Sequence, residues 1–173
     1  MNITFDLETL GNSHQAPIVQ IGAVKFTDKG EIVDSFSRNI KIESLAKYSG
    51  FTIDYSTLQF WFNQSDEAIK MVMCAEQSIT LHAALSDFVN WLAEPDKYVY
   101  WSHATFDPPI LAYNFRQVGI QNPIFYRLHR DIRTLSHFAG KIEVERKGVA
   151  HNALDDCLYQ AEYVSKGIQL IRS

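Results

Sequence analysis

The feature that most constrains this chain is an opening β-prone segment at residues 3–9, in which apolar and polar side chains alternate. Successive side chains of a strand point to opposite faces, so Phe5 and Leu7 share one face. Asp6 and Glu8 then lie side by side on the other face. Neighbouring carboxylates repel each other and are costly to bury. The segment is therefore either a half-exposed edge strand or a strand whose acids hold a cation.

Composition predicts one soluble domain. The chain has 173 residues, of which 46% are hydrophobic and 21% charged, enough for a substantial core, so we expect a single domain over residues 1–173. No apolar run is long enough to span a bilayer, and the N-terminus has no signal-peptide pattern. Cys74 and Cys157 have neither metal-type nor disulfide-type spacing, which favours reduced thiols in a cytoplasmic protein.

The net charge of −4 argues against binding of nucleic acid through a simple basic surface. If four carboxylates belong to a metal site, however, the rest of the chain is neutral. Two divalent cations would neutralise those four acids. A polyanionic substrate is therefore compatible with this composition.

The first part of the chain predicts three strands, at residues 3–9, 18–26 and about 32–40, joined by short connections. A turn that contains Gly30 separates the second from the third. Three successive strands with short connections indicate an antiparallel meander.

Later segments alternate between helix and strand. Apolar residues at three- and four-residue spacing predict an amphipathic helix over about residues 80–93. Asp107 as N-cap and Pro108 as first helical residue predict a helix that ends before Gly119. We also expect a short helix opened by a capping box at 56–59, a helix from Ser65, strands at 98–101 and 124–128, and helices at 131–138 and about 152–168.

This order predicts an α/β domain with a mixed five-stranded sheet, antiparallel at first and then extended by parallel crossovers, flanked by helices. Acidic residues recur at three points of that order: on the first strand, at Asp107, and at 151–156. On one regular helix His151 and Asp156 would differ by about 140°. We therefore expect His151 in the loop before the last helix and Asp156 in its first turns. A capping role at the helix N-terminus is the alternative for Asp156 and the expected role of Asp155.

Three motifs in this order and separation resemble the DEDDh 3′–5′ exonucleases, which belong to the ribonuclease H-like superfamily: Asp6-x-Glu8-Thr9, Phe106-Asp107 and His151-x4-Asp156. The resemblance extends from about residue 1 to 165 and implies the ribonuclease H-like fold. The sister class has tyrosine four residues before the last aspartate. This chain has Asn152 there, so the histidine class matches better.

Three secondary motifs resemble a smaller subgroup, of the RNase AS and phage DexA type: Ile21-Gly22-Ala23-Val24, Thr57-x3-Trp61-x2-Gln64 and Arg130-Asp131-x-Arg133-Thr134-Leu135. One departure stands before the third acid. Many DEDDh enzymes have His-Asn-Ala-x-Phe-Asp, whereas residues 102–107 read Ser-His-Ala-Thr-Phe-Asp. The acid is retained, but the usual asparagine and its hydrogen bond are not.

The resemblance implies two divalent ions, Mg²⁺ or Mn²⁺, which prefer hard oxygen ligands. Asp6 would bridge both ions, Glu8 and Asp156 would hold the ion that binds the nucleophilic water, and Asp107 would support the other. Such a pair stabilises the attacking and the leaving oxygen of a phosphodiester. His151 would act as general base; a loop histidine without a role is the alternative.

The resemblance also implies substrate contacts. Thr9 and Leu10 resemble the positions that meet the terminal sugar and wedge against the last base. Phe106 and His103, close to the third acid, are expected to contact substrate as well. Trp61 is a candidate for stacking a base, with packing of a short helix on the core as the alternative.

The sequence leaves the roles of three further side chains undecided. Phe62 is a second candidate for base stacking. Arg130 and Arg133 could bind phosphate or could pair with acids such as Asp131, and we favour a structural role for at least one of them.

The chain is therefore expected to be a metal-dependent 3′–5′ exonuclease that releases nucleoside 5′-monophosphates from the 3′ end of single-stranded nucleic acid. The RNase AS resemblance slightly favours RNA, and the phage resemblance favours single-stranded DNA; no residue visibly reads the 2′-hydroxyl. A non-catalytic nucleic-acid-binding module would lack an acid or the histidine, and a structural cation would draw its ligands from one loop. The resemblance also implies a homodimer, and no membrane association is expected.

Overall fold

The structure, a computed structural model, describes residues 1–172 and is built on one five-stranded sheet in the order β3-β2-β1-β4-β5. The first three strands pair antiparallel, β4 runs parallel to β1, and β5 runs parallel to β4. The mixed sheet with its meander and parallel extension is confirmed. The strands are β1 (Asn2–Thr9), β2 (Ile18–Phe26), β3 (Ile32–Asn39), β4 (Val99–Ser102) and β5 (His129–Asp131).

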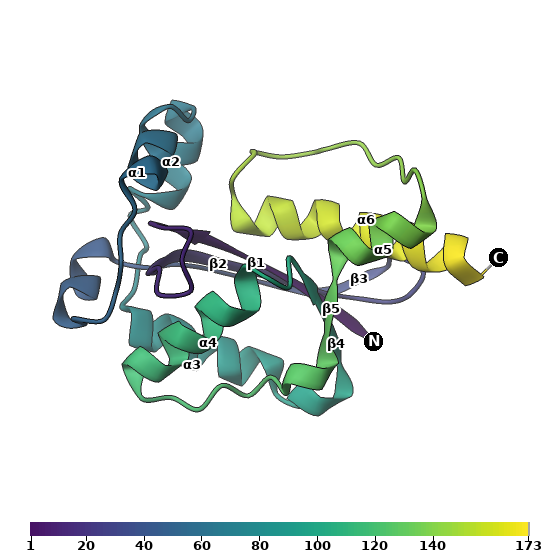
Figure 1. Cartoon of the computed structure of the whole chain (residues 1–173), viewed down its shortest axis with the longest axis horizontal. Helices are drawn as coiled ribbons and strands as arrows, with labels where there is room; N and C mark the ends of the chain where they lie inside the picture. Colours follow the sequence, from purple (N-terminus) through teal and green to yellow (C-terminus); the bar gives the residue numbers. More distant parts are fainter. Residues whose placement is uncertain (173) are drawn as a thin grey trace.

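Helices cover both faces of the sheet (Figure 1). One face packs against α3 (Leu81–Leu92) and α4 (Asp107–Val118), and the other against α5 (Ile132–Ala139) and α6 (Ala153–Arg172). Beyond the carboxyl end of β1 lie α1 (Tyr55–Phe62) and α2 (Asp66–Val72). Short 3-10 turns occupy Ile42–Lys47, Pro95–Lys97 and Tyr126–Leu128. Within residues 1–172, no helix combines the length and the apolar character that a bilayer span requires.

The opening strand, β1, lies in the middle of the sheet. Phe5 and Leu7 are buried on the face toward α3 and α4. The opposite face is covered by α6, where the Thr4 hydroxyl donates to the side chain of Gln160 at 2.6 Å. The edge-strand alternative is therefore wrong, and the two acids of β1 point into a covered interface.

The first turn of α6 lies directly against β2. Gly22 pairs with Asp6 across the β1–β2 ladder, and a Cβ atom at Gly22 would overlap the backbone of Ala153 and the amide of Leu154. Only glycine leaves room for this approach. The missing side chain at Gly22 therefore allows α6 to begin immediately beside the acids of β1.

Polar side chains fix this helix start. Gln20, which lies opposite Glu8 in the ladder, accepts a hydrogen bond from the Ala153 amide at 2.8 Å. The Asn152 side chain accepts from the amide of Asp155 at 3.2 Å, the pattern of an N-cap. Two otherwise unpaired amides of the first helical turn are thus satisfied.

Several sequence-based boundaries are confirmed by their caps. Ser65 accepts from the Ala68 amide at 3.2 Å and begins α2, and Thr80 accepts from the Ala83 amide at 3.3 Å and begins α3. α4 ends at Gly119, which has a positive φ of 75°, as a C-terminal glycine does in many helices.

Three boundaries were wrong. The fifth strand lies at residues 129–131 instead of 124–128, because Tyr126–Leu128 close a 3-10 turn. α1 begins at Tyr55, before the expected capping box, and the carboxylate of Asp54 accepts from the Asn12 amide at 2.6 Å instead of capping the helix. Asp107 is the first residue of α4 and not its N-cap.

Replacing Gly22 by alanine is expected to lower the free energy of unfolding by about 1–3 kcal/mol, because the added methyl group must displace the backbone of α6. Urea unfolding followed by circular dichroism measures this change. Ser37→Ala, at the position paired with Gly22 on β3, is the control and should change stability by less than about 0.5 kcal/mol. Equal stability of Gly22→Ala and wild type would contradict the close packing.

Candidate active site

Four carboxylates from three distant segments converge beside the carboxyl half of β1. Asp6 and Glu8 belong to β1, Asp107 begins the helix that follows the parallel strand β4, and Asp156 lies in the first turn of α6. The carboxyl ends of parallel strands share one edge of a sheet, where sites commonly form. Asp6 is close enough to interact electrostatically with all three other acids.

Burial raises the pKa of all four acids, and repulsion between carboxylates adds to this effect at Asp6, Glu8 and Asp107. Burial, followed by the charge of Asp156, raises the pKa of Asp6 to about 7. Burial and then the charge of Asp6 hold the pKa of Glu8 and of Asp107 well above the usual range. Burial also raises the pKa of Asp156, against the opposing effect of Arg146. The cluster therefore favours binding of protons or of a cation.

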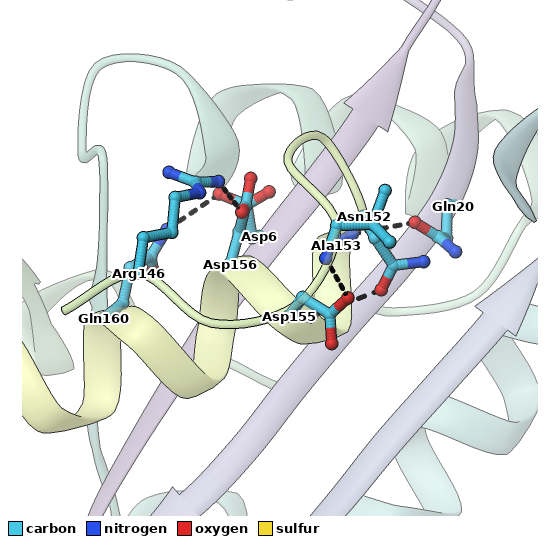
Figure 2. Close-up of polar contacts among 9 residues, drawn as sticks. Asp6, Gln20, Arg146, Asn152, Ala153, Asp155, Asp156 and Gln160 are labelled. Carbon is cyan, nitrogen blue, oxygen red and sulfur yellow. Dashed lines mark hydrogen bonds and ion pairs between the residues drawn. The ribbon is translucent and has the colours of Figure 1, made fainter. Parts of the chain in front are cut away.

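Hydrogen bonds orient two of the acids. Gln160 donates from Nε2 to Oδ1 of Asp6 at 2.9 Å (Figure 2). Its Oε1 accepts from the Thr4 hydroxyl. Asp107 accepts from the backbone amide of His103 at 2.9 Å. These contacts fix the carboxylates of Asp6 and Asp107 before any ligand arrives.

His151 lies in the turn that precedes α6, as expected from its spacing to Asp156. Its φ of 63° is positive, which is uncommon for a residue other than glycine. Its ring meets the edge of Phe60 at a centroid distance of 4.8 Å. The turn and this aromatic contact together hold the imidazole over the acids.

A set of ligand atoms suited to a metal ion is present. One atom each from Glu8, His151 and Asp156 lie within 4.8 Å of one another. Arg146 is the one lysine or arginine among residues 1–172 that pairs with these acids, and its guanidinium contacts the Asp156 carboxylate (Figure 2). Oxygen-rich donors and excess negative charge fit hard divalent cations such as Mg²⁺ or Mn²⁺.

Two cavities adjoin the acids. The first, of about 260 Å³, has Glu8 and Thr9 on one wall and Phe60 and Phe106 on others. The second, of about 370 Å³, reaches from Asp6 and Asp156 toward α5. Phe106 and His103, both expected to contact substrate, line the first and the second cavity respectively.

Other expected substrate contacts are buried. The Trp61 side chain is 3% exposed and donates from its indole nitrogen to the carbonyl of Thr9 at 2.9 Å, which favours the core-packing alternative. Trp61 also lines the first cavity, and base stacking by this residue stays a prediction. Leu10 is also 3% exposed and offers almost no surface as a wedge. The Thr9 hydroxyl donates to the Gly11 carbonyl at 2.7 Å.

Sequence reasoning missed three residues of this site. Gln160 lies one helical turn after Asp156, a spacing that could have indicated a shared face. Phe60, and not its exposed neighbour Phe62, is the aromatic residue that contacts His151. Arg146 is in no motif, and no sequence signal pointed to it.

The arrangement is the ribonuclease H-like fold, shared with solved structures of several nucleases, and the predicted fold is confirmed. Cell-death related nuclease 4 superposes with a TM-score of 0.67 at 19% identity, over 96% of this chain and 63% of that one. S. pombe Pop2p in its Mg²⁺- and Mn²⁺-bound form gives a TM-score of 0.60 at 12% identity, over 94% of this chain and 81% of that one. E. coli Exonuclease I with a dA16 oligonucleotide gives a TM-score of 0.65 at 12% identity, over 98% of this chain and 42% of that one.

The chain belongs to the family of Rv2179c-like 3′–5′ exoribonuclease domains, whose model matches residues 1–168. A curated relative is the exodeoxyribonuclease of Enterobacteria phage T4, which is 28% identical over 130 residues. The aligned region is 69% of this chain and 57% of that relative, so the chain spans little more than half of the relative's length. The resemblance to DEDD exonucleases is thereby confirmed.

The raised pKa of Asp6 predicts that the free energy of unfolding of the metal-free protein decreases as pH rises. Between about pH 4 and its folded pKa of about 7, the folded state binds more protons than the unfolded state, so stability falls as pH rises. With chelator at pH 8, Asp6→Asn should be more stable than wild type by about 1–3 kcal/mol, and at pH 4 the two should agree. Thermal unfolding checks this, and a pH-independent difference would contradict it.

Proposed function

We propose that this chain is a DEDDh-type, metal-dependent 3′–5′ exonuclease that hydrolyses single-stranded nucleic acid, with RNA slightly favoured, to nucleoside 5′-monophosphates. The convergence of Glu8, Asp107 and Asp156 on Asp6, beside His151, carries this proposal; all four acids are buried or half-buried. A binding module or a structural core has no need for such a concentration of unneutralised charge.

The acids would hold two divalent ions. Asp6, which faces the other three acids, suits a bridging position, and Glu8 with Asp156 suits one ion while Asp107 supports the other. Bound ions would activate water and stabilise negative charge on the attacking and leaving oxygens. Gln160 holds one oxygen of Asp6 in place. The Asp6 side chain therefore loses less conformational entropy when a metal ion binds.

His151 would accept the proton of the attacking water at a ring nitrogen. One of its ring nitrogens lies within 4.8 Å of carboxylate oxygens of Glu8 and Asp156, and this proximity supports the role. The ring of Phe60 packs against the imidazole in a T-shaped contact. A general base positioned in this way contributes about 10²–10⁴-fold to a rate.

The smaller cavity would hold the terminal nucleoside at the 3′ end. It has Phe60 and Phe106 as apolar walls, Glu8 and Thr9 beside the acids, and only about 260 Å³ of space. Aromatic walls bind bases with little regard to sequence. A cavity of this size favours a strand end over a continuing strand, which accounts for exonuclease rather than endonuclease action.

RNA and DNA remain close alternatives. The exoribonuclease description of the family favours RNA, whereas the phage T4 relative is an exodeoxyribonuclease, and Exonuclease I binds single-stranded DNA in its crystal structures. A homodimer and a cytoplasmic location stay predictions.

The proposal predicts that wild type shortens 5′-labelled single-stranded RNA or DNA from the 3′ end with Mg²⁺ or Mn²⁺ and not with chelator. Asp156→Asn should be inactive because it removes a metal ligand, and His151→Gln should lose about 10²–10⁴-fold. Denaturing gels of both substrates provide the measurement.

Asp155→Asn is the matched control. Asp155 is adjacent to Asp156 but accepts from the Val149 amide at 2.8 Å, a contact that an asparagine oxygen retains, so near-wild-type activity is expected. Cleavage that persists in chelator, or equal activity of Asp156→Asn and wild type, would overturn the proposed function.

A further inference from the structure

The larger cavity beside the acids carries two arginines on the side away from the sheet. It measures about 370 Å³ and runs from Asp6 and Asp156 to Arg133 of α5 and Arg146 of the segment before α6. We propose that this cavity binds the phosphates of the strand on the 5′ side of the scissile bond, with Arg133 and Arg146 as their ligands. This inference rests on the proposed function and deepens it.

The guanidinium of Arg133 keeps its donors available. Within residues 1–172 it forms no hydrogen bond and no ion pair, although its charge helps to lower the pKa of nearby Asp131, and it is exposed at the cavity. Arg130, by contrast, donates to the carbonyls of Arg127 and His129, both at 2.8 Å. The alternatives that the sequence left open thus separate: Arg130 has the structural role, and Arg133 is available to an anion.

Arg146 forms an ion pair with Asp156, a carboxylate that would instead coordinate a metal ion once one binds. Its guanidinium contacts the Asp156 carboxylate and lies over the ring of Tyr159 at 5.5 Å. Its side chain is 45% exposed. A divalent ion on Asp156 would replace this ion pair and leave a guanidinium at the cavity wall. Arginine binds phosphate through two parallel N–H donors, so a phosphate in the cavity is a suitable new partner.

The two cavities differ in charge, and this difference assigns the direction of the strand. No lysine or arginine lines the smaller cavity, whose walls include Phe60 and Phe106. The scissile phosphate must lie at the acids, with a nucleoside on one side and the phosphate-bearing strand on the other. The cavity with two arginines is the one suited to the strand, and its neutral polar groups include Ser136 and Tyr159.

The proposal makes the effect of each arginine depend on substrate length. The dinucleotide UpU has only the scissile phosphate, whereas an octamer of uridine also has phosphates on the 5′ side. Arg133→Gln and Arg146→Gln should each raise KM for the octamer by about tenfold and should change kcat/KM for UpU by less than about threefold. Arg127→Gln, an exposed arginine that lines neither cavity, is the matched control and should resemble wild type.

A binding measurement provides a second readout. Fluorescence anisotropy of a 5′-labelled uridine octamer, with Ca²⁺ in place of Mg²⁺ and at several KCl concentrations, gives the salt slope of binding. Each arginine variant should reduce that slope by about 0.7, since one phosphate contact is lost. Calorimetric titration with Mn²⁺ should show that Arg146→Gln binds the metal at least as tightly as wild type, because a competitor for Asp156 is gone.

Wild-type salt slopes in both variants, or an equal loss in Arg127→Gln, would overturn the proposal. Equal losses on UpU and on the octamer would also overturn it, because the arginines would then act at the scissile phosphate or on the acids. If wild type cleaves neither substrate, the proposed function fails, and the anisotropy measurement still decides whether the cavity binds a strand.

Discussion

The close packing of α6 on β2 at Gly22 is the constraint on which the site depends. Because Gly22 has no side chain, the backbone of Ala153 can lie against the strand, and the amide of Ala153 reaches the side chain of Gln20. This contact holds Asp156 next to Asp6, its partner from the opposite end of the chain. The strand order then completes the set, since the parallel strand β4 delivers Asp107 to the same edge of the sheet.

The result is a site that is fully built but electrostatically unfavourable until a cation binds. The pKa of each acid is raised chiefly by burial, so the folded metal-free protein must either retain protons or bury negative charge. Gln160, the His103 amide and Arg146 offset part of this cost. Such strain is typical of functional sites, and here it favours the binding of divalent ions.

The sequence was sufficient for most elements of the fold, because strong periodicity and caps such as Ser65 and Thr80 are local signals. The four acids were predicted in another way, from motifs that resemble those of the DEDDh exonucleases. The sequence was not sufficient for side chains whose roles depend on tertiary contacts. The sequence left Trp61 open between base stacking and core packing, because the contact that bears on it, from its indole nitrogen to the carbonyl of Thr9, joins residues 52 positions apart. The contact of Arg146 could not be predicted from the sequence, because it depends on which carboxylate lies next to the segment before α6 in the folded chain. In the β-prone run at 124–128, residues Tyr126–Leu128 instead form a 3-10 turn.

If the acids beside α6 bind metal, the ions must displace Arg146 from Asp156. Anomalous diffraction from crystals soaked in Mn²⁺ shows whether they do. We expect two manganese peaks about 3.5–4 Å apart, bounded by Asp6, Glu8, Asp107 and Asp156, with the Arg146 guanidinium no longer on Asp156. Absence of manganese at the acids while Arg146 stays paired with Asp156 would contradict this expectation.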